Sequence, residues 1–499
     1  MRPPPEFSFR TRRQALSEAA AREVDLLVIG GGIVGSAVAW DAASRGMRTL
    51  LVERRDFGHA TSSRTSKMIH GGLRYLQHLR FSLVRESLRE RKLLARLAPS
   101  YLTWLPLTIP VYRWTEGLAL RAGLLLYDAL AREPEHRRRT LDATEVPARF
   151  PALRREGLRG GLQYWDCVMN DARLNLAVAA AAAQHGALVA SYASVASLSG
   201  RTPEFEVQVR DLIRPEERTV RARAVVNATG PWVDSLRRLE DPAAPPRLRP
   251  NRGAHLLFSA DRLPVDGALA LPFARDRLLF VLPWQGRVIV GTTESEFHGD
   301  LDRVAAEAED WEAILSLVGR FFPAARLGRQ DVLSSFAGVR PIIGSSGSSP
   351  TRMSREHQIL ESASGFISIA GGKYTTFRLM AELVVDRVTR KLEARGMRFA
   401  PCRTAGLSLE QALPAPPALI PTREDVGRSV QYEMALTLSD LLVRRSPAAL
   451  VAEGQALAQA REVSRWAAES LGWSESERQT QLDRYRDEVT RLFAAGKTD

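Results

Sequence analysis

Cysteine is almost missing from this chain of 499 residues, which contains only Cys167 and Cys402. Two cysteines cannot form the disulfide framework of a small secreted protein, so we expect a reducing compartment. No stretch reaches the roughly 18 consecutive apolar residues that a membrane-spanning helix needs. The first 22 residues are rich in arginine but have no apolar core, which excludes a secretory signal and predicts a flexible tail over residues 1–22.

Lysine is also scarce, with five residues, so arginine supplies most of the positive charge behind the net charge of +13. The chain lacks a basic segment interleaved with aromatic side chains, so we expect no nucleic-acid partner. It also lacks a cluster of His and Cys at metal-ligand spacing, so we expect no metal site. A hydrophobic content of 45% is typical of a globular protein, and the length predicts two or three domains.

A dinucleotide-binding signature stands near the N-terminus. The apolar run Val24–Ile29 predicts a buried parallel strand, and it leads directly into Gly30-x-Gly32-x-x-Gly35 and a predicted helix. Gly30 permits a tight turn, Gly32 lets the backbone approach a pyrophosphate, and Gly35 lets helix and strand pack closely. Glu53 ends the next strand, where its carboxylate can accept hydrogen bonds from a ribose. The pattern predicts a Rossmann-like unit.

Two more glycine-rich strand ends lie far downstream, at Asn227-Ala-Thr-Gly230 and Ile369-Ala-Gly-Gly-Lys373. An FAD molecule is extended, with its isoalloxazine ring far from its adenine, and it needs contacts from several strand ends. An NAD site would need fewer. The three glycine-rich segments therefore favour FAD over NAD as the cofactor.

The rest of the chain predicts an antiparallel sheet and a helical tail. Residues 255–293 form an alternating block that is typical of antiparallel strands. Beyond residue 401, a proline-rich linker leads into helices with start signals such as Thr422 with Asp425. The apolar segment Leu118–Leu130 is interpreted as a buried cap helix, with a bilayer contact or a path for a quinone as the alternatives.

Several motifs together resemble those of the FAD-dependent glycerol-3-phosphate dehydrogenases, within the wider D-amino-acid-oxidase-like flavoproteins. They are Gly30–Gly35, Ala60–Leu76, Tyr164–Leu174, Asn227–Trp232, Val290–Thr293, Ala337–Pro341 and Gly371–Arg378. The resemblance covers about residues 25–400. Asn170 stands where the family usually has Asp, and the stretch between Gly406 and Thr422 is shorter than usual. No calcium-binding loop is visible, so the chain resembles the bacterial form more than the mitochondrial one.

The resemblance implies an α/β (α+β) fold in which a Rossmann-like FAD-binding domain is interleaved with an antiparallel-sheet substrate domain. We expect this oxidoreductase region at residues 23–400 and a C-terminal helical domain at residues 401–499. The FAD-binding segments are expected at about residues 23–80, 155–235 and 335–400. The substrate-binding segments are expected at about residues 81–154 and 236–334.

A phosphate ester needs fixed cations, and arginine suits it because guanidinium groups make bidentate charge-assisted hydrogen bonds. The positions that match the family's anion site are Arg74, Arg340 and Arg355, although most arginines in so arginine-rich a chain are surface charges. Tyr75 and Thr293 are expected to position the substrate.

Oxidation of an alcohol removes the hydroxyl proton while a hydride moves to the flavin. His255 matches an active-site histidine of the family, and a neutral imidazole can accept that proton near pH 7. The alternative is a hydrogen-bonded structural histidine. Arg340 and Lys373 complete the expected catalytic set, and Lys373 is expected beside the flavin, where it stabilises the anionic reduced ring; the alternative is an ion-paired lysine.

The loop after the second predicted strand carries small hydroxyl side chains that can bond a pyrophosphate or the edge of a flavin ring without bulk. A plain solvent loop is the alternative. The expected cofactor-binding residues are Gly30, Gly32, Gly35, Glu53, Thr61, Ser62, Ser63, Ser66, Lys67, His70, Gly71, Gly230, Gly371, Gly372, Lys373 and Thr375.

The resemblance implies oxidation of sn-glycerol 3-phosphate to dihydroxyacetone phosphate, with electrons passed from FAD to a quinone. The alternatives are an oxidase of another small substrate and a flavin-binding protein without catalysis. We expect peripheral membrane association and a place in the cytoplasm at the inner face of the cytoplasmic membrane. The sequence leaves open whether the chain forms a homodimer.

Overall fold

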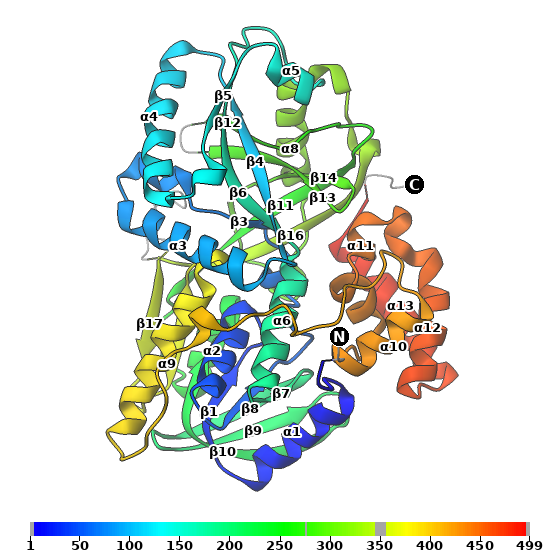
Figure 1. The fold of residues 1–499 in the computed structure, drawn as a ribbon. Coiled ribbons are helices and arrows are strands. Elements are labelled where there is room, and N and C mark those ends of the chain that lie inside the picture. Colours follow the sequence, from blue (N-terminus) through cyan, green and yellow to red (C-terminus); the bar gives the residue numbers. More distant parts are fainter. Residues whose placement is uncertain (1–3, 275–276, 345–355, 496–499) are drawn as a thin grey trace.

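The structure is a computed structural model that describes residues 4–274, 277–344 and 356–495. It contains two sheets, one above the other in Figure 1, with helices packed around them and a helical region at the C-terminal end. The predicted α/β class is confirmed, as is the combination of a Rossmann-like body, an antiparallel sheet and C-terminal helices.

The lower sheet forms the Rossmann-like body. Val24–Ile29 forms β1 as predicted, and each of its residues is buried, as expected for a central parallel strand. The strands in spatial order are β17 (His357–Glu361), β18 (Ile367–Gly371), β10 (Glu216–Asn227), β1, β2 (Thr49–Val52) and β7 (Leu188–Ala190). An antiparallel pair, β8 (Ala193–Arg201) and β9 (Glu204–Asp211), extends the sheet from β10.

The helices of this body include α2 (Ile33–Ser44), α6 (Asp171–Gln184) and α9 (Phe377–Glu393). α2 packs against both other helices and is buried on nearly all sides, which its small apolar residues permit. It begins directly after the glycine-rich turn. A Cβ atom at Gly35 would lie 1.8 Å from the carbonyl oxygen of Gly30, so only glycine lets the helix approach the turn this closely.

The upper sheet is antiparallel apart from the pairing of β12 with β4. β11 lies between β14 and β16, and its register places His255 opposite Gly291 and Phe336. The strands in order are β15 (Ser295–Glu296), β11 (Leu248–Ser259), β14 (Arg287–Gly291), β13 (Arg277–Trp284), β12 (Ala268–Ala274), β4 (Leu102–Pro110), β6 (Gly161–Met169) and β3 (Met68–Ile69), with β16 (Val332–Ile343) on β11 and β5 (Arg139–Leu141) on β6.

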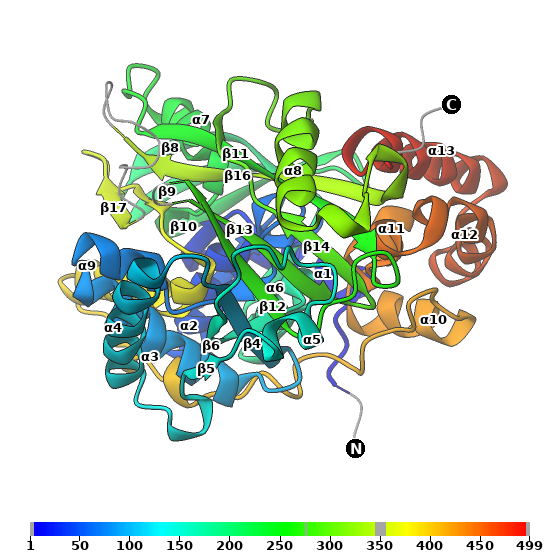
Figure 2. The ribbon, with the colours of Figure 1, turned by 90° about the horizontal axis from the view of Figure 1, so that it is seen from above.

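The remaining helices lie around the two sheets. The C-terminal helices occupy the flank opposite to α4 in both views (Figures 1 and 2). Thr422 and Asp425 form the predicted capping box at the start of α10. These helices are α3 (Phe81–Leu97), α4 (Trp114–Ala131), α5 (Glu145–Arg149), α7 (Val233–Glu240), α8 (Ala308–Phe321), α10 (Arg423–Tyr432), α11 (Ala448–Val451), α12 (Leu457–Leu471) and α13 (Glu475–Leu492).

The predicted flexible tail over residues 1–22 is wrong for its greater part, because Phe9–Ala21 form α1. Ser8 and Thr11 form a capping box that starts the helix. Arg12 is fully buried, and its guanidinium makes a bidentate ion pair with Asp211 at 2.6 and 2.9 Å. One of the arginines of this segment therefore anchors the helix to β9.

The interpretation of Leu118–Leu130 as a buried helix is also wrong. The segment lies in α4, where Leu118 is 54% and Leu125 is 51% exposed. Within the segment only Leu124 and Tyr127, which are three residues apart and therefore on one face of the helix, are buried. A segment that is apolar on most sides gives no hint of which side is covered.

Among the helices of the described residues, none is long and apolar enough to cross a bilayer.

Candidate active site

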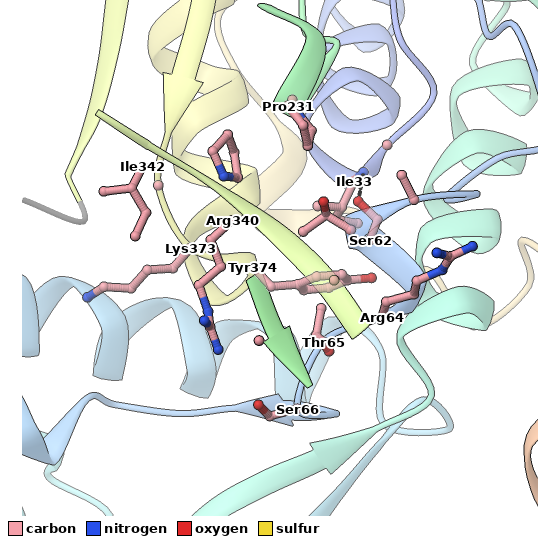
Figure 3. Close-up of a pocket in the computed structure, with 18 of the residues that line it drawn as sticks. Ile33, Ser62, Arg64, Thr65, Ser66, Pro231, Arg340, Ile342, Lys373 and Tyr374 are labelled. Carbon is pink, nitrogen blue, oxygen red and sulfur yellow. Dashed lines mark hydrogen bonds between the residues drawn. The ribbon is translucent and has the colours of Figure 1, made fainter. Parts of the chain in front are cut away.

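A cavity of about 820 Å³ lies between the two sheets. Its lower wall comes from the carboxyl ends of β1, β2, β10 and β18, and its upper wall comes from β11, β16 and the residues after β14. Ligands bind at the carboxyl ends of parallel strands in folds of this type. Figure 3 shows side chains from both walls converging on this space.

The glycine-rich turn forms one end of the cavity. Gly30 and Gly32 line it, and the amide of Ile33 donates to Ser62 Oγ at 2.9 Å. The Glu53 carboxylate accepts from the amides of Gly31 and Arg55 at 2.6 and 2.8 Å. Burial raises the pKa of Glu53. Gly35 packs against the turn instead of lining the cavity, so its role is in helix packing.

A pair of side chains that the sequence analysis missed closes the same end. The Arg54 guanidinium lies 4.6 Å from the centre of the Trp232 ring, and both residues line the cavity. Arg54 also pairs with Asp302 at 2.5 Å. A planar cation over an indole forms a cation–π contact and offers a flat surface to an adenine-sized ring. Arg54 directly follows Glu53 in the sequence, and this position could have identified it as a residue of the cavity.

The loop after β2 contributes Thr61, Ser62 and Ser66 to the cavity wall, but not Ser63 or Lys67. Lys67 is 2% exposed, and its Nζ donates to the carbonyl of Ser63 at 2.7 Å and to Asp171 at 2.6 Å. Lys67 stabilises the loop from the side that faces away from the cavity, so it has no direct contact with a ligand there.

Arg340 reaches the cavity from β16. Its guanidinium donates to Asn251 Oδ1 at 2.9 Å and to Thr292 Oγ1 at 3.1 Å. A Cβ atom at Gly253 would lie 2.5 Å from Arg340 Nη2, so the absence of a side chain there makes room for the guanidinium. Figure 3 shows the side chain pointing towards Ser66.

His255 lies on β11 beside this arginine. Its ring stacks on Phe336 with the ring centres 4.7 Å apart, and Nε2 is hydrogen-bonded to Ser66 Oγ at 2.9 Å. Burial, together with the charges of Arg340 and Lys67, holds the pKa of His255 well below its ordinary value. The imidazole is therefore neutral near pH 7, as a proton acceptor must be.

Thr293 is a structural link as well as a residue of the cavity wall. Its hydroxyl donates to Asp310 Oδ1 at 2.7 Å and accepts from the amide of Ala254 at 3.0 Å. Asp310 also pairs with Arg252 at 3.0 Å, and both residues line the cavity. The sequence analysis missed Asn251, Arg252 and Asp310, because only the register of β11 and the position of α8 bring them here.

Lys373 lines the cavity from the turn after β18. Its Nζ donates to Ser87 Oγ of α3 at 3.0 Å and lies 4.0 Å from the centre of the Tyr75 ring. The neighbouring Tyr374 hydroxyl donates to the carbonyl of Asp171 at 2.7 Å. In Figure 3 the lysine extends away from Arg340.

The other predicted residues divide into three groups. Those on the cavity wall are His70, Gly230, Gly371, Gly372 and Thr375. Gly71 lies behind the wall, where its amide donates to Asp166 at 2.9 Å. The side chain of Arg74 and the whole of Arg355 lie outside the described residues. Within the described residues no group of three His, Cys, Asp or Glu side chains could hold a metal ion.

Comparison with known proteins decides the family. Residues 25–387 match the family described as FAD dependent oxidoreductase. The chain belongs to this family. Residues 387–478 match a second description, the C-terminal domain of alpha-glycerophosphate oxidase. The resemblance inferred from the motifs is confirmed at this level, and FAD is the cofactor.

Individual relatives carry more specific names. The chain is 38% identical over 448 residues to the mitochondrial glycerol-3-phosphate dehydrogenase of Mesocricetus auratus, covering 86% of this chain. It spans only 61% of that relative's length. It is 34% identical to a glycerol-3-phosphate dehydrogenase of Mycobacterium leprae, covering 96% of this chain and 90% of the relative. The crystal structure of the Bacillus halodurans glycerol-3-phosphate dehydrogenase with FAD is 27% identical, with a TM-score of 0.79 and 99% of each chain covered.

The residues of the cavity fit FAD. A Cβ atom at Gly30 would lie 2.7 Å from the carbonyl oxygen of Ala228, so the turn is as tight as a pyrophosphate-binding turn requires. The first residues of α2 line the cavity. Its N-cap, Gly32, has no side chain to cap the helix, and the N-terminus of a helix is a favourable place for a phosphate. Trp232, the glycine-rich turn and Arg340 all line this one cavity of about 820 Å³, which suits an extended dinucleotide.

Proposed function

We propose that the chain oxidises sn-glycerol 3-phosphate to dihydroxyacetone phosphate, with the hydride passing from the carbinol carbon to FAD. One observation carries this proposal: Arg340 and the neutral, buried His255 lie in the same cavity as the FAD-binding turn. A phosphate ester needs the cation and an alcohol needs the proton acceptor, and both groups are held in place by hydrogen bonds.

The protein's own groups divide the work. Arg340 binds the phosphate and is kept in one orientation by Asn251 and Thr292. As the carbinol C–H bond breaks, the hydroxyl proton moves to His255 Nε2, directly or through the Ser66 hydroxyl. A carbonyl group forms on the substrate. When bound, FAD supplies the two-electron acceptor for the hydride.

Further residues complete the proposed site. Tyr75 and Thr293 position the substrate from the cavity wall, and Lys373 contributes a second cation next to Tyr75. Arg74 and Arg355 are proposed as additional phosphate ligands on the basis of their matching positions in the sequence alone.

The proposed division of the chain follows the same logic. FAD-binding segments at about residues 23–80, 155–235 and 335–400 alternate with substrate-binding segments at about residues 81–154 and 236–334. The helical domain comprises residues 401–499. The lower wall of the cavity comes from the proposed FAD-binding segments alone. The upper wall combines β11 and the residues after β14, which lie in a substrate-binding segment, with β16, most of which lies in the third FAD-binding segment.

A quinone at a membrane surface is the proposed electron acceptor. Leu73 and Tyr75 line the cavity from η2 (Leu73–His78), and η2 contacts α4. The exposed Leu118 and Leu125 of α4 stand on either side of the exposed Arg121 along the chain, and exposed arginines, Arg113 and Arg132, cap the two ends of the helix, a pattern suited to an anionic lipid surface. We propose peripheral attachment at the inner face of the cytoplasmic membrane. A homodimer stays a prediction.

The direct test is anaerobic reduction of the bound flavin. Glycerol 3-phosphate should bleach the flavin absorbance, whereas glycerol, which lacks the phosphate, and D-alanine, an amino-acid substrate for related oxidases, should not. Bleaching by D-alanine alone would replace the proposal with the amino-acid oxidase. Bleaching by none of the three would favour a flavin-binding protein without this catalysis.

A further inference from the structure

The loop after β2 is held from two sides. On the cavity side, Glu53 accepts from the amide of Gly31. On the opposite side lies Asp56, which is fully buried and does not line the cavity. The amide of Gly58 donates to the carbonyl of Gly31 at 3.0 Å, so residues 53–58 and the glycine-rich turn form one hydrogen-bonded unit.

The groups that hold Asp56 come from the C-terminal helical region. Arg444 donates through Nε to Asp56 Oδ2, and Arg445 makes a bidentate pair with the same carboxylate at 2.5 and 3.0 Å. Both arginines are at least 96% buried. Burial alone would raise the pKa of Asp56, but the two guanidinium groups outweigh it and hold that pKa below its ordinary value.

The two arginines are fixed on their own side as well. Arg444 donates to Asp440 at 2.8 Å, and Arg445 donates to the carbonyl of Glu433 at 2.6 Å. Two guanidinium groups on one carboxylate are therefore balanced by further acceptors of the C-terminal region. A buried pair of this kind does little for stability on its own, but it fixes geometry because leaving either charge unpaired is costly.

A second contact supports the same loop. The Phe57 ring stacks on Phe7 with the ring centres 5.8 Å apart. Phe7 in turn exchanges backbone hydrogen bonds with Gln431 and Met434 at 3.1 and 2.7 Å. A Cβ atom at Gly31 would lie 2.8 Å from Phe57, so this ring packs directly against the glycine-rich turn.

We propose that Asp56, Arg444 and Arg445 are positioning residues for FAD, through which the C-terminal helical region sets the geometry of residues 53–58. The region thereby determines how tightly the adenosine and pyrophosphate end of FAD is held. The inference depends on the FAD site and not on which substrate is oxidised.

The test is Asp56→Asn in the holoenzyme, with Asp211→Asn as the matched control. Asp211 also accepts a buried bidentate arginine, but it lies outside the cavity and contacts α1. The readouts are the FAD dissociation constant, from free-flavin fluorescence on dilution, and the unfolding temperature. We expect Asp56→Asn to raise the dissociation constant about tenfold or more, and Asp211→Asn to leave it within about twofold of wild type.

The proposal would be overturned if Asp56→Asn and Asp211→Asn lowered the unfolding temperature by a similar amount and had equal FAD dissociation constants. Asp56 would then only stabilise the fold. If Asp56→Asn does not yield folded protein, Arg445→Lys carries the test, because it keeps the charge and loses the bidentate pair. Its dissociation constant should rise severalfold, and a wild-type value would overturn the proposal. The measurement needs no substrate, so it is independent of the proposed oxidation.

Discussion

Single glycines and hydrogen-bonded side chains set the geometry of the site at the residue scale. Gly253 and Gly291 are examples: a Cβ atom at the first would lie 2.5 Å from Arg340 Nη2, and one at the second would lie 2.4 Å from the His255 ring. Arg340 and His255 therefore occupy space that two glycines leave free. A substitution at Gly253 or Gly291 would displace the side chain of Arg340 or His255 without changing its chemical identity.

Gly253→Ala is predicted to raise the KM for glycerol 3-phosphate about tenfold or more, a loss of about 1.4 kcal/mol or more. The new methyl group meets the end of a flexible side chain, so Arg340 shifts while the fold is kept. Steady-state kinetics and the unfolding temperature check this. Gly319→Ala in α8 is the control, since a Cβ atom there meets nothing within 4 Å. An unchanged KM in Gly253→Ala would argue against the placement of Arg340.

The acid limb of the pH profile is a second residue-scale prediction. Burial and the charges of Arg340 and Lys67 lower the pKa of His255. The imidazole therefore stays neutral at pH values below about 6.5, the ordinary pKa of a histidine. We expect kcat at saturating substrate to stay constant from pH 8 down through 6.5 and to fall only at lower pH. His255→Asn should reduce kcat by about a hundredfold or more.

The stability of the protein should follow the same titration. A histidine with a lowered pKa in the folded state stabilises the fold above its unfolded-state pKa, and this contribution is lost as the pH falls towards the folded-state value.

For the kinetic prediction, a decline of kcat centred at pH 6.5, with full activity in His255→Asn, would exclude the histidine as the base.

Secondary-structure elements differ in how far the sequence determined them. Val24–Ile29 and the helix after it were predictable, because a buried apolar run and a glycine-rich turn are local signals. α1 was missed because the prediction used only the abundance of arginine and the lack of an apolar core in this segment, and not the capping pair Ser8 and Thr11. His255 and Arg340 were found through motifs. Asn251, their neighbour, was not, because its contact with Arg340 depends on the register between β11 and β16.

The exposure of α4 leads to a prediction about this element. The double variant Leu118→Gln, Leu125→Gln should weaken sedimentation with vesicles that contain anionic lipid and should lower turnover with a vesicle-borne quinone. Turnover with a water-soluble dye should be unchanged, because neither leucine lines the cavity.

The control places the same change on another surface. Leu212→Gln, Ile213→Gln alters two exposed apolar residues in the turn between β9 and β10. It should behave as wild type in both assays. Equal vesicle binding by wild type and the α4 variant would remove this helix from the proposed membrane surface.

At the scale of the whole molecule, the site belongs to no single part of the chain. The parallel sheet provides the FAD-binding turn, the antiparallel sheet provides Arg340 and His255, and the C-terminal helices hold the loop that carries Glu53. The two walls of the cavity come from segments interleaved along the sequence. This arrangement is consistent with the family match, which runs continuously through segments of both walls over residues 25–387.

The central claim is that a hydride leaves the carbinol carbon of glycerol 3-phosphate in this cavity, and single-turnover reduction of the bound FAD measures it most directly. The holoenzyme is mixed anaerobically with saturating glycerol 3-phosphate that carries either hydrogen or deuterium at that carbon, and the flavin absorbance is followed. The account predicts full bleaching with both compounds and a slower rate with the deuterated one. Flavin that stays oxidised with both would contradict it.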